Sequence, residues 1–281
     1  DYSNLDSFYE LINWQNRIEK DTHIYFSHYA EMLLTAQGVE DNSNIKINFD
    51  PSFETVELHF VRVRRDGKII DKTDLSEFSI YREETDRDKL LYNGMLQMSY
   101  IVPDIRVGDM LEYAYTLKGK NPAFGPHFSL RLRQQYNDVV LGLTRRTLIS
   151  NDLPVYTKNH ANAIDPEKKN LGSFTEYLWE LKNETPIDFD DNSPAWYYNY
   201  PSYQMTSFKN WSEVGQFFAP VYKSSDALPA DLEAVREQIL IDFDGQDERM
   251  RAALDYVQKN IRYLGIEIGS GGYEPRSVST V

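Results

Sequence analysis

The sequence predicts a mainly β fold, an antiparallel β-sandwich, with a C-terminal α-helical segment. Apolar and polar residues tend to alternate from residue 25 to residue 185, which is the period of half-buried strands. After residue 205 the apolar period becomes helical. Turn signals also follow one another too closely to leave room for crossover helices, so the strands are expected to be antiparallel.

The composition is that of a globular protein, and 281 residues are enough for about two domains. A net charge of −14 repels phosphate, which argues against a nucleic-acid partner. The chain contains no cysteine, so these residues can form neither a disulfide nor a thiolate metal site. No apolar run approaches the ~18 residues that span a bilayer, and we do not expect a membrane-spanning segment.

Residues 1–24 are expected to form a short helical lead-in, because Leu5, Phe8 and Ile12 give a partial helical stripe. The antiparallel β-sandwich domain should occupy residues 25–185. Within it, Asp66-Gly67 predicts a tight turn between two paired strands. Further strands are expected at 75–83, 90–102, 110–117, 128–136, 139–150 and 174–181.

Residues 186–208 contain several prolines and are expected to be a linker, followed by helices in residues 209–281. The clearest helix is expected at 246–261, where apolar residues form one stripe at helical spacing. We expect part of this stripe to lack a partner surface, residues 196–203 to pack against the helices, and residues 269–281 to be the least ordered segment. The residues of the stripe are Met250, Leu254, Val257 and Ile261.

Two groups of segments resemble bacterial transglutaminase-like proteins. Residues 250–263, which end in Ile-Arg-Tyr, and the Gly-Gly-Tyr-Glu-Pro loop at 271–275 resemble the opening of a transglutaminase-like core. The segments 36–39, 64–68, 107–113 and 121–125 resemble the module of unknown function that precedes such cores in bacterial envelope proteins. The resemblance implies that residues 209–281 are the incomplete N-terminal part of a papain-like α+β domain.

The same resemblance implies that a nucleophilic cysteine follows the Gly-Gly loop and that its histidine and aspartate partners come later. Because the sequence stops before that segment, we expect no catalytic residue here and no enzyme activity of this chain. We expect a non-catalytic module that positions a polypeptide substrate or partner protein, or braces the rest of its own transglutaminase-like core. The implied location is the bacterial periplasm, cell envelope or exterior, and the start at Asp1 without Met fits a removed signal peptide.

The candidate ligand surface is an aromatic cluster between the two expected domains. Its rings could stack on sugars, which makes a carbohydrate-binding sandwich the alternative function, or they could pack between the domains. The residues are Trp196, Tyr197, Tyr198, Tyr200 and Tyr203.

No cofactor or metal site is predicted. The histidines lack metal-ligand spacing, and the Gly-rich loop 269–272 lacks the pattern of a nucleotide-binding loop. Asp188, Asp190 and Asn192 start like a calcium loop, but the glycine and glutamate that such a loop needs further on are absent.

Overall fold

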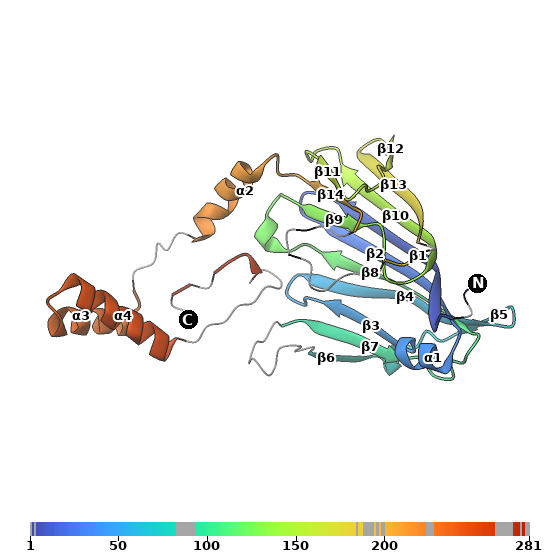
Figure 1. The fold of residues 1–281 in the computed structure, drawn as a ribbon, viewed down its shortest axis with the longest axis horizontal. Helices are drawn as coiled ribbons and strands as arrows, with labels where there is room; N and C mark the ends of the chain where they lie inside the picture. The colour runs from blue at the N-terminus through green and yellow to red at the C-terminus, as the bar shows by residue number, and fades with distance from the viewer. Residues whose placement is uncertain are drawn as a thin grey trace. The chain divides into compact units, whose positions relative to one another are not determined.

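The computed structural model describes every residue except 1, 3, 83–93, 184, 188–193, 195–196, 198–199, 223–227, 262–271, 276 and 279–281. The chain divides into two compact units (Figure 1). The first comprises residues 1–83 and 94–211, and the second comprises residues 84–93 and 212–281. The described elements of the first unit are mainly strands, and those of the second are helices.

The first unit is built on an eight-stranded mixed sheet in the order β12-β13-β10-β1-β2-β8-β4-β5. Its strands are β1 (Ser7–Ile18), β2 (His23–Leu33), β4 (Glu54–Arg65), β5 (Lys68–Asp71), β8 (Met110–Gly119), β10 (Val140–Ser150), β12 (Glu167–Asn170) and β13 (Phe174–Asn183). Neighbouring strands are antiparallel except for β1 and β10, which are parallel.

Two three-stranded sheets accompany it, in the orders β3-β7-β6 and β11-β14-β9. Their strands are β3 (Asn44–Phe49), β6 (Ser79–Arg82), β7 (Leu96–Ile101), β9 (Ser129–Arg133), β11 (Tyr156–His160) and β14 (Ser202–Thr206). The connections include helix α1 (Ala36–Asn42) and the 3-10 turns η1 (Leu75–Glu77) and η3 (Pro122–Phe124).

The two small sheets pack against different ends of the large sheet (Figure 1). At one end, Ile47 of β3 joins Val61 of β4 in a buried cluster. At the other end, Met205 of β14 joins Trp179 of β13 and Ile149 of β10. Burial of such side chains stabilises a fold by about 1.5–3 kcal/mol each, so these clusters fix both small sheets on the large one.

Both small sheets lie on one face of the large sheet, which we call the inner face. Strand pairing places Val61, Tyr113 and Tyr29 side by side across β4, β8 and β2. The same alternation places Trp14 of β1 beside Arg145 of β10, which pairs with Trp179. The middle strands β1 and β2 therefore carry the part of the inner face that lies between the two small sheets.

The mainly β class with C-terminal helices is confirmed, but the expected single antiparallel sandwich is replaced by a mixed sheet with two small sheets on it. The helical lead-in at residues 1–24 was wrong, because Ser7–Ile18 forms β1. Hydrogen bonding to a strand on each side outweighs the weak helical stripe. The parallel pair was missed because turn spacing limits only strands that follow one another in the chain.

The predicted linker 186–208 is also partly structured. Its residues Ser202–Thr206 form β14, the central strand of a small sheet, between β11 and β9. The predicted Asp66-Gly67 turn is confirmed, since both residues adopt the positive φ angles, 49° and 72°, that such a hairpin turn requires.

The second unit contains α3 (Ala230–Asp242) and α4 (Gln246–Asn260), and α2 (Trp211–Phe218) and the turn η4 (Ala219–Tyr222) lie at its start. Helix α4 is confirmed, with acidic residues in its first turn. Its apolar residues Met250, Leu254 and Val257 are exposed. Most of the tail 269–281 lies outside the described residues, and the packing of residues 196–203 against the helices stays a prediction. Among the described helices, none is long and apolar enough to cross a membrane.

Candidate functional site

The five predicted aromatic residues do not share one surface. Tyr203 is buried in the core beneath β14, where its ring lies 5.1 Å from that of Trp179. Tyr197 is 56% exposed, and Tyr200 is half-buried. Trp196 and Tyr198 lie outside the described residues. Tyr203 therefore serves packing, and among the described members of this cluster only Tyr197 and Tyr200 can face a ligand.

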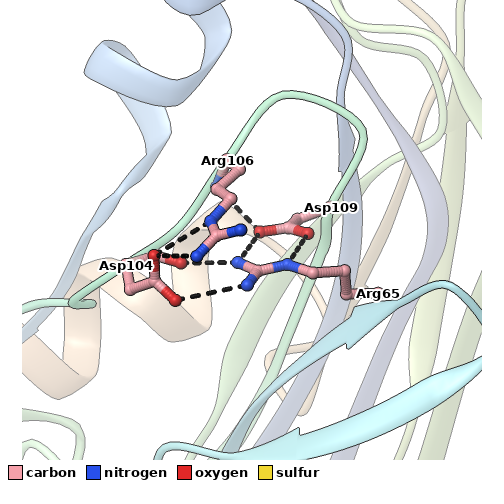
Figure 2. Close-up of polar contacts among 4 residues, drawn as sticks. All are labelled: Arg65, Asp104, Arg106 and Asp109. Atoms are coloured by element: carbon pink, nitrogen blue, oxygen red, sulfur yellow. Dashed lines mark hydrogen bonds and ion pairs between the residues drawn. The ribbon is translucent and has the colours of Figure 1, made fainter.

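The segments 64–68 and 107–113, which carry the family resemblance, meet at the loop before β8 (Figure 2). Arg65 donates two hydrogen bonds of 2.7 Å to the buried carboxylate of Asp109. It also reaches Asp104 Oδ2 at 3.2 Å, while the backbone N–H of Arg106 donates to Asp109 at 2.7 Å. Burial alone would raise the pKa of Asp109, but these hydrogen bonds outweigh it and lower that pKa.

A second ion cluster lies on the opposite, outer face of the large sheet, around Glu112 of β8. Arg62 donates to both carboxylate oxygens at 2.8 and 2.6 Å, and Arg64 donates at 2.6 Å. His28 Nε2 lies 2.9 Å from Oε1. Burial raises the pKa of Glu112, but the hydrogen bonds from these three side chains bring it down to about 2.

Both clusters are saturated networks, and they tie β4 to β8 and to the loop in front of it. The carboxylate oxygens of Asp109 and Glu112 are already occupied by donors from the protein. Neither carboxylate is left to act as a base or to bind a ligand. The segments behind the resemblance thus hold the sheet together.

A different arrangement lies on the inner face, where cationic and aromatic side chains alternate in what we call the arginine–aromatic row. The Arg133 guanidinium lies 4.4 Å from the Tyr200 ring and 5.2 Å from the Tyr136 ring. Arg145 donates a hydrogen bond to the Tyr136 hydroxyl and stacks on Trp14, 4.1 Å from its ring. The row consists of Tyr200, Arg133, Tyr136, Arg145, Trp14 and Tyr29.

The row continues into a group of stacked tyrosines at the middle of the sheet. Trp14 Nε1 donates to the Tyr29 hydroxyl at 2.8 Å, and the Tyr29 ring stacks on that of Tyr113 with centroids 5.0 Å apart. Burial raises the pKa of Tyr113, so this phenol is uncharged at neutral pH. Aromatic rings with polar ends, placed beside guanidinium groups, are typical of surfaces that bind other chains.

Arg145 is the unusual member of the row because it is a buried cation. Only 8% of the residue is exposed. In the part of the chain that the structure describes, no carboxylate lies within ion-pair distance of it, and its Nε is buried without a hydrogen-bond partner. The hydroxyl of Thr147, two residues further along the same face, is also buried and unpartnered. Natural proteins rarely leave such groups unsatisfied without a reason.

Glu31 is a second buried charge of the inner face, near the start of β1. It pairs with Tyr9 across the strands and accepts a 2.7 Å hydrogen bond from the Ser7 hydroxyl. Burial raises the pKa of Glu31 to about 7, although the bond from Ser7 opposes the shift. Over the described ranges, no three histidine or acidic side chains gather closely enough to hold a metal ion.

Sequence reasoning found Tyr200 but missed the rest of the row, because its members come from four strands and two loops. One signal was present. Leu143, Arg145, Thr147 and Ile149 alternate along one face of β10, so an arginine occupies a position that the pattern reserves for an apolar residue.

The comparisons with known proteins concern the family and the fold. A family model described as a domain of unknown function with a solved structure (DUF3857) matches residues 19–188. No curated protein matches the chain. A crystal structure from Parabacteroides distasonis, described as a "putative protease", aligns with a TM-score of 0.78 and 16% identity over 98% of this chain and 54% of that one. The chain thus spans about half the length of that structure, and at this identity the likeness shows the fold alone.

Several zinc peptidase structures align with this chain at lower TM-scores. Aminopeptidase A from Legionella pneumophila aligns with a TM-score of 0.36 and 11% identity, over 73% of this chain and 22% of that one. An M1 zinc metallopeptidase from Deinococcus radiodurans aligns with a TM-score of 0.36 and 7% identity, over 71% and 42% of the two chains. TM-scores this low do not establish a shared fold, and nothing is concluded from these two alignments.

Proposed function

Since the chain belongs to the DUF3857 family, whose model covers residues 19–188 of 281, we propose that it is a non-catalytic module that positions a polypeptide for a longer, protease-like protein. The polypeptide is a substrate or a partner protein. Thiol chemistry would belong to the remainder of the longer protein, a transglutaminase-like acyltransferase or a cysteine protease, because this chain has no cysteine. Nucleic acid is not a partner, and no cofactor is required.

The observation that carries this proposal is the arginine–aromatic row. Trp, Tyr and Arg are the side chains that contribute most to binding other chains, because they offer large flat surfaces and directional donors. Here Trp14 and Tyr29 are half-buried on strands of the large sheet and Tyr136 is half-buried on a loop, and all three are held by ring contacts and hydrogen bonds. Such a pre-organised surface binds with little loss of side-chain entropy.

The exposed stripe of α4 supports the second part of the proposal, that residues 209–281 begin a transglutaminase-like core. Leu254 is 55% exposed, and Met250 and Val257 are exposed beside it on the same helix. A further part of the longer protein would cover this stripe.

We place the protein in the bacterial periplasm, envelope or exterior, and fractionation of cells that express the natural protein with a C-terminal tag tests this location.

A peptide array probed with the purified chain tests the positioning role. We expect the chain to retain unstructured peptides, and Tyr200→Ala to weaken the signal by roughly threefold to tenfold, as loss of one aromatic contact does. Tyr222→Ala is the matched control, because Tyr222 is an exposed tyrosine outside the row. An array on which no peptide is retained, or on which both variants lose signal equally, would contradict the proposal.

The alternative, sugar binding through the aromatic cluster, keeps less support because Tyr203 is buried. A glycan array probed with the same protein separates the two functions. Sugar binding that is lost in Trp196→Ala while peptides are not retained would favour the alternative.

A further inference from the structure

We propose that Arg145 binds a carboxylate group of the positioned polypeptide. This inference rests on the proposed function, since the polypeptide supplies the ligand. The carboxylate is either the chain terminus or the side chain of an aspartate or glutamate, and both present the same two oxygens to a guanidinium.

The charge of Arg145 lacks the compensation that its neighbours have. Arg146, the next residue, points to the outer face and pairs with Glu176 at 2.6 Å. Arg65 has two carboxylate partners. Arg145 is more deeply buried than either, yet across the described residues it has no carboxylate partner. A cation removed from water without an anion is costly, so a ligand that brings an anion gains a large differential interaction.

Tyr136 does not supply the missing anion. Its hydroxyl accepts from Arg145 and donates to the backbone oxygen of Arg133 at 2.7 Å, so its single proton is already in use. Burial raises the pKa of Tyr136, although the charge of Arg145 opposes the shift. The phenol is therefore neutral at physiological pH, and among the described residues the positive charge of Arg145 has no anionic partner.

The guanidinium is held in place before any ligand arrives. Stacking on Trp14 at 4.1 Å fixes the plane of the guanidinium, and the hydrogen bond to Tyr136 fixes its rotation. Its Nε–H is buried and has no partner in the described part of the chain. The planar guanidinium of Arg145, with an unused donor at Nε, matches the geometry of a carboxylate, which accepts two parallel hydrogen bonds.

The surroundings favour a carboxylate over a more highly charged anion. The chain carries a net charge of −14, so a phosphate dianion would be repelled over the whole molecule. Trp14 and Tyr136 flank Arg145 with half-buried rings, and Tyr29 contacts Trp14. A monoanion attached to an apolar or aromatic side chain fits these walls.

The experiment uses a short fluorescent, tyrosine-containing peptide in three forms. One has a free terminal carboxylate, one has an amidated terminus, and one has an amidated terminus and an internal glutamate. Fluorescence anisotropy with the wild-type chain should show that a carboxylate form binds at least about tenfold more tightly than the neutral form, as a charge-assisted hydrogen bond implies. The carboxylate form that binds more tightly shows whether Arg145 prefers a chain terminus or an acidic side chain.

Arg145→Met should remove this preference, and Arg145→Lys should restore only part of it, because lysine keeps the charge and loses the fork. Arg146→Met is the matched control, since it removes the same charge from the adjacent residue on the outer face. It should leave the preference unchanged. If Arg145→Met does not fold, competition by phenylacetate against phenylacetamide on the wild-type chain replaces it, and only phenylacetate should displace the peptide.

The inference is wrong if wild type binds charged and neutral peptides equally, if phenylacetate and phenylacetamide compete equally, or if Arg145→Met and Arg146→Met behave alike. In these cases peptides still bind and the positioning role stands. If wild type binds no form of the peptide, both the inference and the proposed function fail.

Discussion

The two faces of the large sheet handle buried charge in opposite ways. Glu112 on the outer face and Glu31 on the inner face are 1% and 5% exposed. Burial raises the pKa of both, but hydrogen bonds from two arginines and a histidine bring that of Glu112 down to about 2. Glu31 accepts a hydrogen bond from a serine hydroxyl, and its pKa stays near 7. The partners of a buried group, more than its burial, decide whether it is charged at neutral pH.

The arginines repeat this contrast. Arg62 and Arg64 of the outer face share one carboxylate, while Arg145 of the inner face meets rings and a neutral phenol. A saturated network holds strands together. An unsatisfied cation does not, and proteins keep such groups mainly where binding requires them. We therefore propose that the ion clusters of the outer face serve stability, and that Arg145 on the inner face serves recognition.

The largest effect should follow from breaking the outer cluster. Glu112→Gln leaves three donors around an uncharged amide, so the free energy of unfolding should fall by about 3 kcal/mol. This loss is near the lower end for a broken buried ion pair, because Arg62 and Arg64 are partly exposed. Urea denaturation measures this loss. Glu57→Gln, an exposed glutamate of β4, is the control and should change stability by less than about 0.5 kcal/mol. An unchanged midpoint for Glu112→Gln would remove the assignment of the outer face to stability.

Glu31 should make stability depend on pH in the opposite sense to a paired carboxylate. The folded state holds its proton more tightly than the unfolded state, whose carboxyl pKa is about 4.5. Its contribution is therefore greatest below pH 4.5 and is lost as the pH rises to about 7, with a total change of up to about 3 kcal/mol. Unfolding curves across this range measure the change. Glu31→Gln should flatten the profile, and a mutant profile parallel to that of the wild type would contradict the assignment.

Arg145 should contribute little to stability, which sharpens the contrast with the outer arginines. Arg145→Met removes a charge that has no carboxylate partner among the described residues, and it keeps an apolar chain. The free energy of unfolding should therefore stay within about 1 kcal/mol of wild type or rise. Arg65→Met, which leaves Asp109 without its partner, should lower it. Thermal melts of both variants measure whether each arginine contributes to stability. A clear loss of stability in Arg145→Met would show that Arg145 also holds the fold together, and only the competition experiment on the wild-type chain would then test its binding role.

The smallest effect on the large sheet should come from a substitution in the second unit. Leu254→Asp places a charge on the exposed stripe of α4 and should loosen the helical segment while the strands stay protected. Hydrogen exchange measured strand by strand tests this. Strands that lose protection together with the helices would show that the two units unfold as one cooperative unit.

Local patterns in the sequence were sufficient for much of the fold. Alternation identified most strands, Asp66-Gly67 identified a hairpin, and the stripe of Met250 and Leu254 identified α4. The failures were non-local. Nothing near β1 indicates that it pairs with β10, which is far away in the chain, and only that pairing brings Trp14 beside Arg145. The row could not be predicted because its geometry depends on this register.

Strand β1 also has a consequence for how the protein is made. It lies between β2 and β10, so it joins one half of the large sheet, β2-β8-β4-β5, to the other, β10-β13-β12. A ribosome releases β1 early and β10 more than a hundred residues later. During that interval one edge of β1 is unpaired, and an unpaired edge is a template for association with other chains. Synthesis therefore passes through a stage in which the edge that β10 later closes is open to association with other chains.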